Sequence, residues 1–134
     1  MRANLAIALA SSVLLLVALG SARAQTAGPA ASVAKARLLY ACFHFANEGS
    51  RGAASPQKEQ LRRVAMNFLA VATQEVVAAD PDKNPLNTQL ATQTSAEGKA
   101  DFVAMMNEAS KLATADETNA RIGQFANSCT KAMN

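Results

Sequence analysis

Apolar residues recur every three to four positions along most of the chain, which is the spacing of one buried face of an α-helix. This spacing predicts helices over about 32–47, 56–79 and 96–113, and a last helix from 115 onward. The segment 80–95 is less regular and is expected to hold one or two helical turns around 86–91. We therefore predict an all-α fold, a small antiparallel bundle of four helices with a short fifth as the alternative.

Polar residues, proline and glycine mark the expected helix ends. Ser32 is expected to cap the first helix and Gly49 to end it. Ser55 is expected to cap the second helix, because the following Pro56 lacks the N–H group that the first helical position leaves unpaired. The Thr-x-x-Glu spacing that begins at Thr114 predicts a capping box for the last helix.

The first predicted helix is apolar on almost every side and holds three of the chain's six aromatic residues. Such a helix must be covered on more than one side. We predict that it is the central helix of the bundle, and a homodimer interface along one of its sides is the alternative. If it also carries a binding surface, the candidate residues on it are Arg37, Tyr40, His44, Phe45 and Glu48.

Each of the other helices carries one apolar stripe. The stripe of the second helix comprises Leu61, Val64, Ala65, Phe68, Ala72, Val76 and Ala79. The stripe of the third comprises Phe102, Met105, Met106, Ala109 and Leu112, and Gly98 weakens the start of this helix. The stripe of the last comprises Thr118, Ile122, Phe125, Ala126, Cys129 and Met133.

The N-terminal segment has the pattern of a secretory signal peptide. Met1 and Arg2 precede an apolar run over 5–19, and the small residues of Ala22-Arg23-Ala24 follow it. We expect cleavage after Ala24, a flexible lead-in over 25–31 and a single helical domain over 32–134. The protein would then be periplasmic or secreted and would keep no stable membrane anchor after cleavage.

Charge gives little support for a nucleic-acid partner. The chain of 134 residues has 13 basic and 10 acidic side chains, a formal net charge of +3. Because Arg2 and Arg23 leave with the signal peptide, the mature net charge is about +1. Arg62-Arg63 is the one adjacent basic pair, so neither a basic stripe nor a stacking platform is present.

The two cysteines, Cys42 and Cys129, lie near opposite ends of the mature chain. An exported protein folds in an oxidising compartment, so we predict a disulfide between them. A loop of this length would add about 4 to 5 kcal/mol of stability through chain entropy. Two cysteines and one histidine are too few for the usual four zinc ligands, and we expect no metal site.

Candidate chemistry is sparse in the rest of the chain. Asp80, Asp82 and Asn84 have the spacing of the first calcium ligands of an EF-hand loop, but Pro85 replaces the glycine such a loop needs. His44 is the single imidazole, and helical spacing places it near Glu48 on a partly exposed strip. Neither a nucleophile motif nor a covalent haem-attachment sequence accompanies it.

These observations favour a protein that works by binding. We expect a protein partner in the periplasm, with the chain acting as an inhibitor, immunity or stress-chaperone protein and not as an enzyme. We expect no cofactor. The alternative is a carrier of a small ligand, haem or metal that would use the bundle core and His44.

Overall fold

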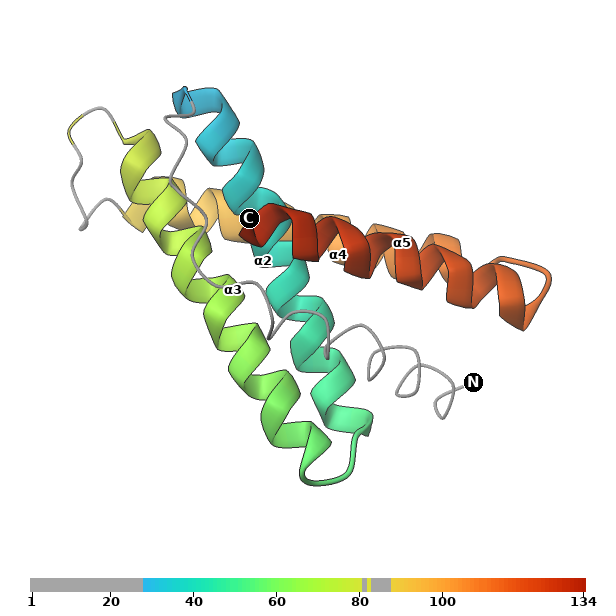
Figure 1. Ribbon diagram of the computed structural model, residues 1–134. Coiled ribbons are helices and arrows are strands. Elements are labelled where there is room, and N and C mark those ends of the chain that lie inside the picture. The colour runs from blue at the N-terminus through green and yellow to red at the C-terminus, as the bar shows by residue number, and fades with distance from the viewer. Residues whose placement is uncertain (1–27, 81, 83–87) are drawn as a thin grey trace.

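The structure is a computed structural model that describes residues 28–80, 82 and 88–134. The expected signal peptide at 1–24 and the first part of the lead-in lie outside the described residues, as do positions 81 and 83–87. The described residues are 88% helical and contain no strand. They form α2 (Pro29–Gly52), α3 (Gln57–Ala79), α4 (Thr88–Ser110) and α5 (Ala115–Met133), which confirms the all-α fold (Figure 1).

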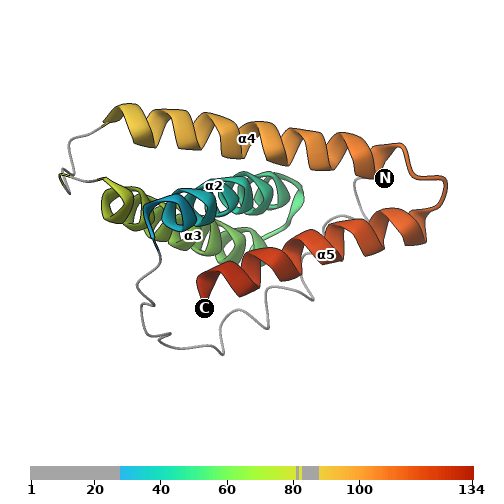
Figure 2. The ribbon, with the colours of Figure 1, turned by 90° about the horizontal axis from the view of Figure 1, so that it is seen from above.

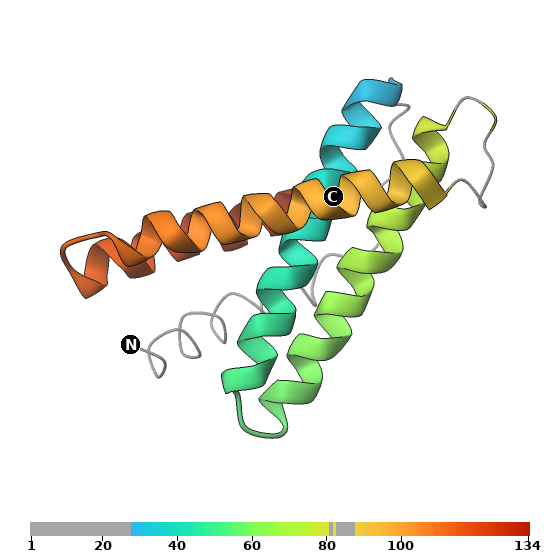
Figure 3. The ribbon, with the colours of Figure 1, turned by 180° about the vertical axis from the view of Figure 1, so that it is seen from behind.

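The four helices form two antiparallel hairpins that cross each other. α2 and α3 run side by side in opposite directions, and the α4–α5 hairpin lies across them (Figures 1 and 3). Seen from above, α4 and α5 lie on opposite sides of α2 (Figure 2). α2 contacts each of the other three helices, so its position is central.

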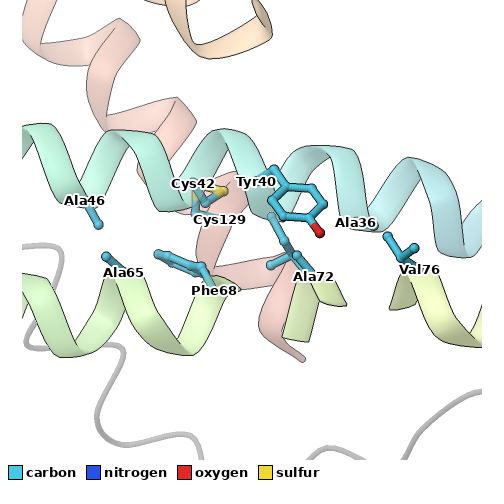
Figure 4. Packing of buried hydrophobic residues seen from close by; sticks show 10 residues of the cluster. Ala36, Tyr40, Cys42, Ala46, Ala65, Phe68, Ala72, Val76 and Cys129 are labelled. Carbon is cyan, nitrogen blue, oxygen red and sulfur yellow. A yellow bond between two sulfur atoms is a disulfide. The ribbon is translucent and has the colours of Figure 1, made fainter. Parts of the chain in front are cut away.

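Apolar side chains of contrasting size fill the space between α2 and α3. Alanines at facing positions let the two helices approach closely, and Phe68 and Leu39 fill the space between them. The predicted stripe of α3 is buried, apart from Val64, which is partly exposed. Figure 4 shows the facing side chains, which are Ala36, Tyr40, Cys42 and Ala46 on α2 and Ala65, Phe68, Ala72 and Val76 on α3.

A second cluster joins α2 to the α4–α5 hairpin. It comprises Phe45, Met105, Ala109, Ile122 and Ala126. The ring of Phe45 meets that of Phe125 edge-on, with the ring centroids 5.3 Å apart. Within the hairpin, the Thr118 hydroxyl lies 3.2 Å from the carbonyl oxygen of Ala109 at the end of α4 and 3.0 Å from that of Thr114, and it shares its one proton between these two acceptors.

The predicted disulfide joins Cys42, in the middle of α2, to Cys129, near the end of α5. The two Cα atoms are 5.7 Å apart, and both side chains are buried. The bond therefore ties the second hairpin to the central helix through the core (Figure 4).

α2 and α4 cross at Gly98, which is buried. A Cβ atom at this position would lie 2.6 Å from the carbonyl oxygen of Arg37, 2.6 Å from the Cβ of Tyr40 and 3.1 Å from the backbone nitrogen of Ala41. The backbones of the two helices thus touch where α4 has no side chain.

The first helix is longer at both ends than its polar residues suggest. It begins at Pro29, so residues 29–31 of the expected lead-in are helical and Ser32 lies inside the first turn. Proline suits this first position because its N–H group is absent. The helix also continues through Gly49 to Gly52, because Gly49 and Ser50 are buried and packing outweighs the low propensity of glycine.

Two other expected boundaries also move. α3 begins after Pro56, and Ser55 does not cap it. α4 begins at Thr88, eight residues before the expected start at Ala96, because Leu90 and Ala91 pack against the α2–α3 core and Thr94 is buried. The Thr94 hydroxyl donates a hydrogen bond of 2.7 Å to the carbonyl of Leu90 within the same helix. α4 ends at Ser110, so Leu112 is exposed and does not extend the stripe.

The predicted capping box at the start of α5 is confirmed. The N–H group of Glu117 donates to the Thr114 hydroxyl over 3.2 Å, and the N–H group of Thr114 donates to the Glu117 carboxylate over 3.1 Å. The two bonds satisfy donors that the first turn of a helix leaves unpaired.

Candidate functional site

Arg37 of the predicted surface lies on α2 and reaches across to α4. Its Nε and Nη2 atoms donate to the two carboxylate oxygens of Asp101 over 2.5 and 2.7 Å, and its Nη1 atom donates to Glu97 over 3.3 Å. The hydrogen bond from Arg37 lowers the pKa of the Asp101 carboxyl group. Arg37 is therefore engaged in holding the two hairpins together, and its charge is already neutralised within the chain.

His44 is half-buried, and its ring contacts two phenylalanines. The ring centroid lies 5.0 Å from that of Phe43 and 6.3 Å from that of Phe102 on α4. The expected neighbour Glu48 instead accepts a hydrogen bond of 3.2 Å from Arg51. These contacts favour a packing role for His44 between α2 and α4 over the role of a haem or metal ligand.

We expect the stability of the fold to depend on the protonation of His44. Burial lowers the pKa of His44 below its usual 6.5, and the positive charge of Lys99 lowers it further. The unfolded chain therefore binds the proton at a higher pH than the folded chain does. The free energy of unfolding should accordingly be highest above pH 6.5 and fall as the pH is lowered through that value.

Urea unfolding at pH values above and below 6.5 measures this dependence. His44→Gln should remove it in the range where carboxylates stay ionised, which is about pH 5 to 7.5. An unfolding midpoint of the wild type that does not change over this range would contradict the prediction.

The other members of the predicted surface do not form one exposed patch. Tyr40 and Phe45 are 4% and 5% exposed and belong to the two core clusters. The other helices cover the sides of α2 that carry Tyr40 and Phe45, so these two residues add no exposed surface, and their role in binding stays a prediction. Glu48 is exposed and paired with Arg51, so no shared surface brings it together with Tyr40 and Phe45.

The turn that resembled a calcium loop ends α3. The N–H group of Asp82 donates to the Asp80 carboxylate over 2.9 Å, which is the geometry of an Asx turn. The remaining positions of the motif lie outside the described residues. Among the residues that the structure describes, no group of three or more histidine, cysteine, aspartate or glutamate side chains could hold a metal ion.

A different surface, on α3, is open to solvent. α3 lies at the edge of the fold, with α2 along one side (Figures 1 and 3). We define the α3 outer face as the exposed residues spaced three or four apart on the side away from α2. They are Glu59, Arg62, Arg63, Met66, Asn67, Ala70, Thr73 and Gln74.

Met66 is the most exposed large apolar side chain of the described residues, at 58%. Arg62 and Arg63 lie one turn before it, and Ala70 lies one turn after it. Met66 thus stands in the middle of the α3 outer face, between a basic segment and a neutral segment of short side chains.

Sequence reasoning missed this face, although two signals were visible. Arg62-Arg63 is the chain's adjacent basic pair, and Met66 falls outside the apolar stripe of its helix. A long apolar residue off the stripe indicates surface exposure once the stripe is known. Aromatic residues concentrate on the first helix and gave it the appearance of a binding surface, but the core needs the same residues.

None of the described helices has both the length and the apolar character of a membrane-crossing segment. The other large apolar side chains exposed in the described residues are Val103 on α4 and Leu112 after it, and each stands on a different part of the fold from Met66. No protein-family model, curated protein or solved structure matches the chain.

Proposed function

We propose that the chain is an exported protein that binds another protein through the α3 outer face and catalyses no reaction. The exposure of Met66 between arginines and short side chains carries this proposal. Methionine and arginine are enriched at protein interfaces. The flexible thioether of methionine also adapts to differently shaped partners.

Two features support export to the periplasm or beyond. The sequence over 1–24 has the basic start, apolar run and small residues of a secretory signal peptide. The disulfide between Cys42 and Cys129 suits an oxidising compartment, since such bonds are rare in the reducing cytosol.

The distribution of apolar surface favours an inhibitor or immunity protein over a stress chaperone. A chaperone needs a broad apolar patch to hold unfolded chains. Among the described residues, the large exposed apolar side chains stand singly on α3, on α4 and in the turn before α5. A single apolar side chain surrounded by polar ones fits a partner with a defined shape.

Site-specific photo-crosslinking in the producing cell tests the proposal. A benzophenone amino acid at position 66 should give a light-dependent adduct of discrete mass with another protein. The matched control carries the same group at Ala120, which is exposed on α5. Adducts of the same mass and yield from both positions, or none from position 66, would refute binding through the α3 outer face.

A further inference from the structure

We propose, on the basis of the function above, that the α3 outer face binds an acidic segment of its protein partner, in which carboxylates flank an apolar side chain. The carboxylates would pair with Arg62 and Arg63, and the apolar side chain would pack on Met66.

Positive charge is in excess on the first half of α3. Lys58, Arg62 and Arg63 are basic there, and Glu59 is the one acidic side chain among them. The ion pair between Arg62 and Glu59 spans 3.5 Å, and both side chains are more than half exposed. Lys58 and Arg63 form no ion pair within the described residues. Of these two, Arg63 lies on the α3 outer face, so one unpaired positive charge there is available to a partner, next to Arg62 in its exposed pair.

Helix stability does not account for this arrangement. The N-terminus of a helix carries partial positive charge, so basic side chains in its first turn are unfavourable. Lys58 lies in the first turn of α3, and no basic residue lies in the last turn, where it would be favourable. Lys58 is therefore placed against the dipole of its helix, whereas Glu59 in the same turn is placed in favour of it, and Arg62 and Arg63 lie beyond the first turn, where the dipole has little effect.

The rest of the molecule offers few free carboxylates to this surface. Within the described residues, almost every glutamate and aspartate is already engaged in an ion pair, a capping box or a turn. The engaged acids are Glu48, Glu59, Glu75, Glu97, Asp101, Glu108, Glu117 and Asp80. A second copy would have to break such a contact on most of its own acids as well as the exposed Arg62–Glu59 pair, whereas a different protein can offer unpaired carboxylates, so a different protein is favoured.

The basic cluster is also too small for an anionic membrane. Membrane recruitment by charge alone uses about four to eight lysines or arginines close together. The first half of α3 has three, and Glu59 offsets one of them. Exposed Met66 next to this cluster instead fits the mixed polar and apolar contacts of a protein interface.

Binding of two labelled polymers to the full purified chain tests the inference. The first probe is polyglutamate, and the second is a glutamate-rich random copolymer of glutamate and tyrosine. The copolymer should bind more tightly, because tyrosine can pack on Met66. Arg62→Gln/Arg63→Gln should weaken the binding of both probes by about tenfold, because each exposed ion pair that is lost weakens binding by about threefold. Met66→Gln should weaken binding of the copolymer by about fivefold and leave the affinity for polyglutamate unchanged.

The matched control is Lys99→Gln/Lys111→Gln, which removes two exposed charges from α4 and the residue after it. It should change the affinity by less than about twofold, because these lysines lie outside the α3 outer face. Equal weakening by the lysine and arginine variants would show attraction to net charge alone and would overturn the inference. Absence of copolymer binding would also overturn it.

Two further measurements decide between occupants. Phosphatidylglycerol vesicles can also be tested. If they bind more tightly than the copolymer and through the same arginines, the ligand of the α3 outer face is a membrane and not a protein segment. If sedimentation shows a dimer of the wild type that disappears in Arg62→Gln/Arg63→Gln, the ligand of the α3 outer face is a second copy of this chain. If crosslinking at position 66 captures a protein while the copolymer does not bind, the acidic segment is refuted and the proposed function stands.

Discussion

Replacing Gly98 by alanine should lower the free energy of unfolding by about 3 kcal/mol, although alanine is the better helix former by about 1 kcal/mol. The new methyl group would lie 2.6 Å from the Arg37 carbonyl oxygen and 2.6 Å from the Cβ of Tyr40. Both neighbours belong to the backbone or its first side-chain atom and cannot rotate away. α4 must then move off α2, which loosens the crossing of the two hairpins.

Gly123→Ala is the matched control, because Gly123 also lies inside a helix but has no atom within 4 Å of the added Cβ. This variant should raise the free energy of unfolding by about 0.5 to 1 kcal/mol through helix propensity alone. Urea unfolding followed by circular dichroism measures both changes. If Gly98→Ala were as stabilising as Gly123→Ala, the close contact between α2 and α4 would be refuted.

Removing the disulfide should have the largest effect on stability. In the double variant Cys42→Ala/Cys129→Ala, the unfolded chain regains the freedom that a closed loop with a sequence separation of 87 had removed. Chain entropy predicts a loss of about 4 to 5 kcal/mol for such a loop. The same urea experiment measures it, with α5 expected to show the greatest rise in hydrogen exchange.

Reduction of the wild type separates the bond from the side chains. The sulfur atoms are buried, so a thiol reductant should act on the folded chain only slowly. If the wild type is unfolded, reduced and then refolded, its free energy of unfolding should be nearly as low as that of the double variant. The stability of the double variant should not change with the reductant. A double variant within about 1 kcal/mol of the oxidised wild type would contradict the role given to the bond.

The helices and their buried faces were predictable because, within each helix, apolar residues recur with the single spacing of about 3.6 residues that one helical face requires. The stripes of α3 and α5 needed no knowledge of neighbouring helices, since a single apolar side must face the core. The start of α4 was not predictable in this way. Thr94 belongs to a polar run that is typical of a loop, and its burial depends on Leu90 and the helices that α4 crosses.

Gly98 shows why the crossing itself was missed. In the sequence, this glycine only weakens a helix. In the structure it lets two backbones touch, and this depends on Tyr40 and Ala41, more than 50 residues earlier in the chain. The burial of two candidate site residues was missed for a related reason. Tyr40 and Phe45 have the composition of a binding surface, and only the path of α4 and α5 determines that they are covered.

The crossing of the hairpins also imposes an order on folding. α2 and α3 are neighbours in the chain and can pair early, whereas the contact of Arg37 with Asp101 spans 64 residues and requires α4 to return across them. Cys129 reaches Cys42 only after this second step. Because the sequence holds two cysteines, one intramolecular pairing exists, so an oxidant suffices and no disulfide shuffling is needed. We therefore expect the disulfide to form late in folding, after the second hairpin has packed on the first.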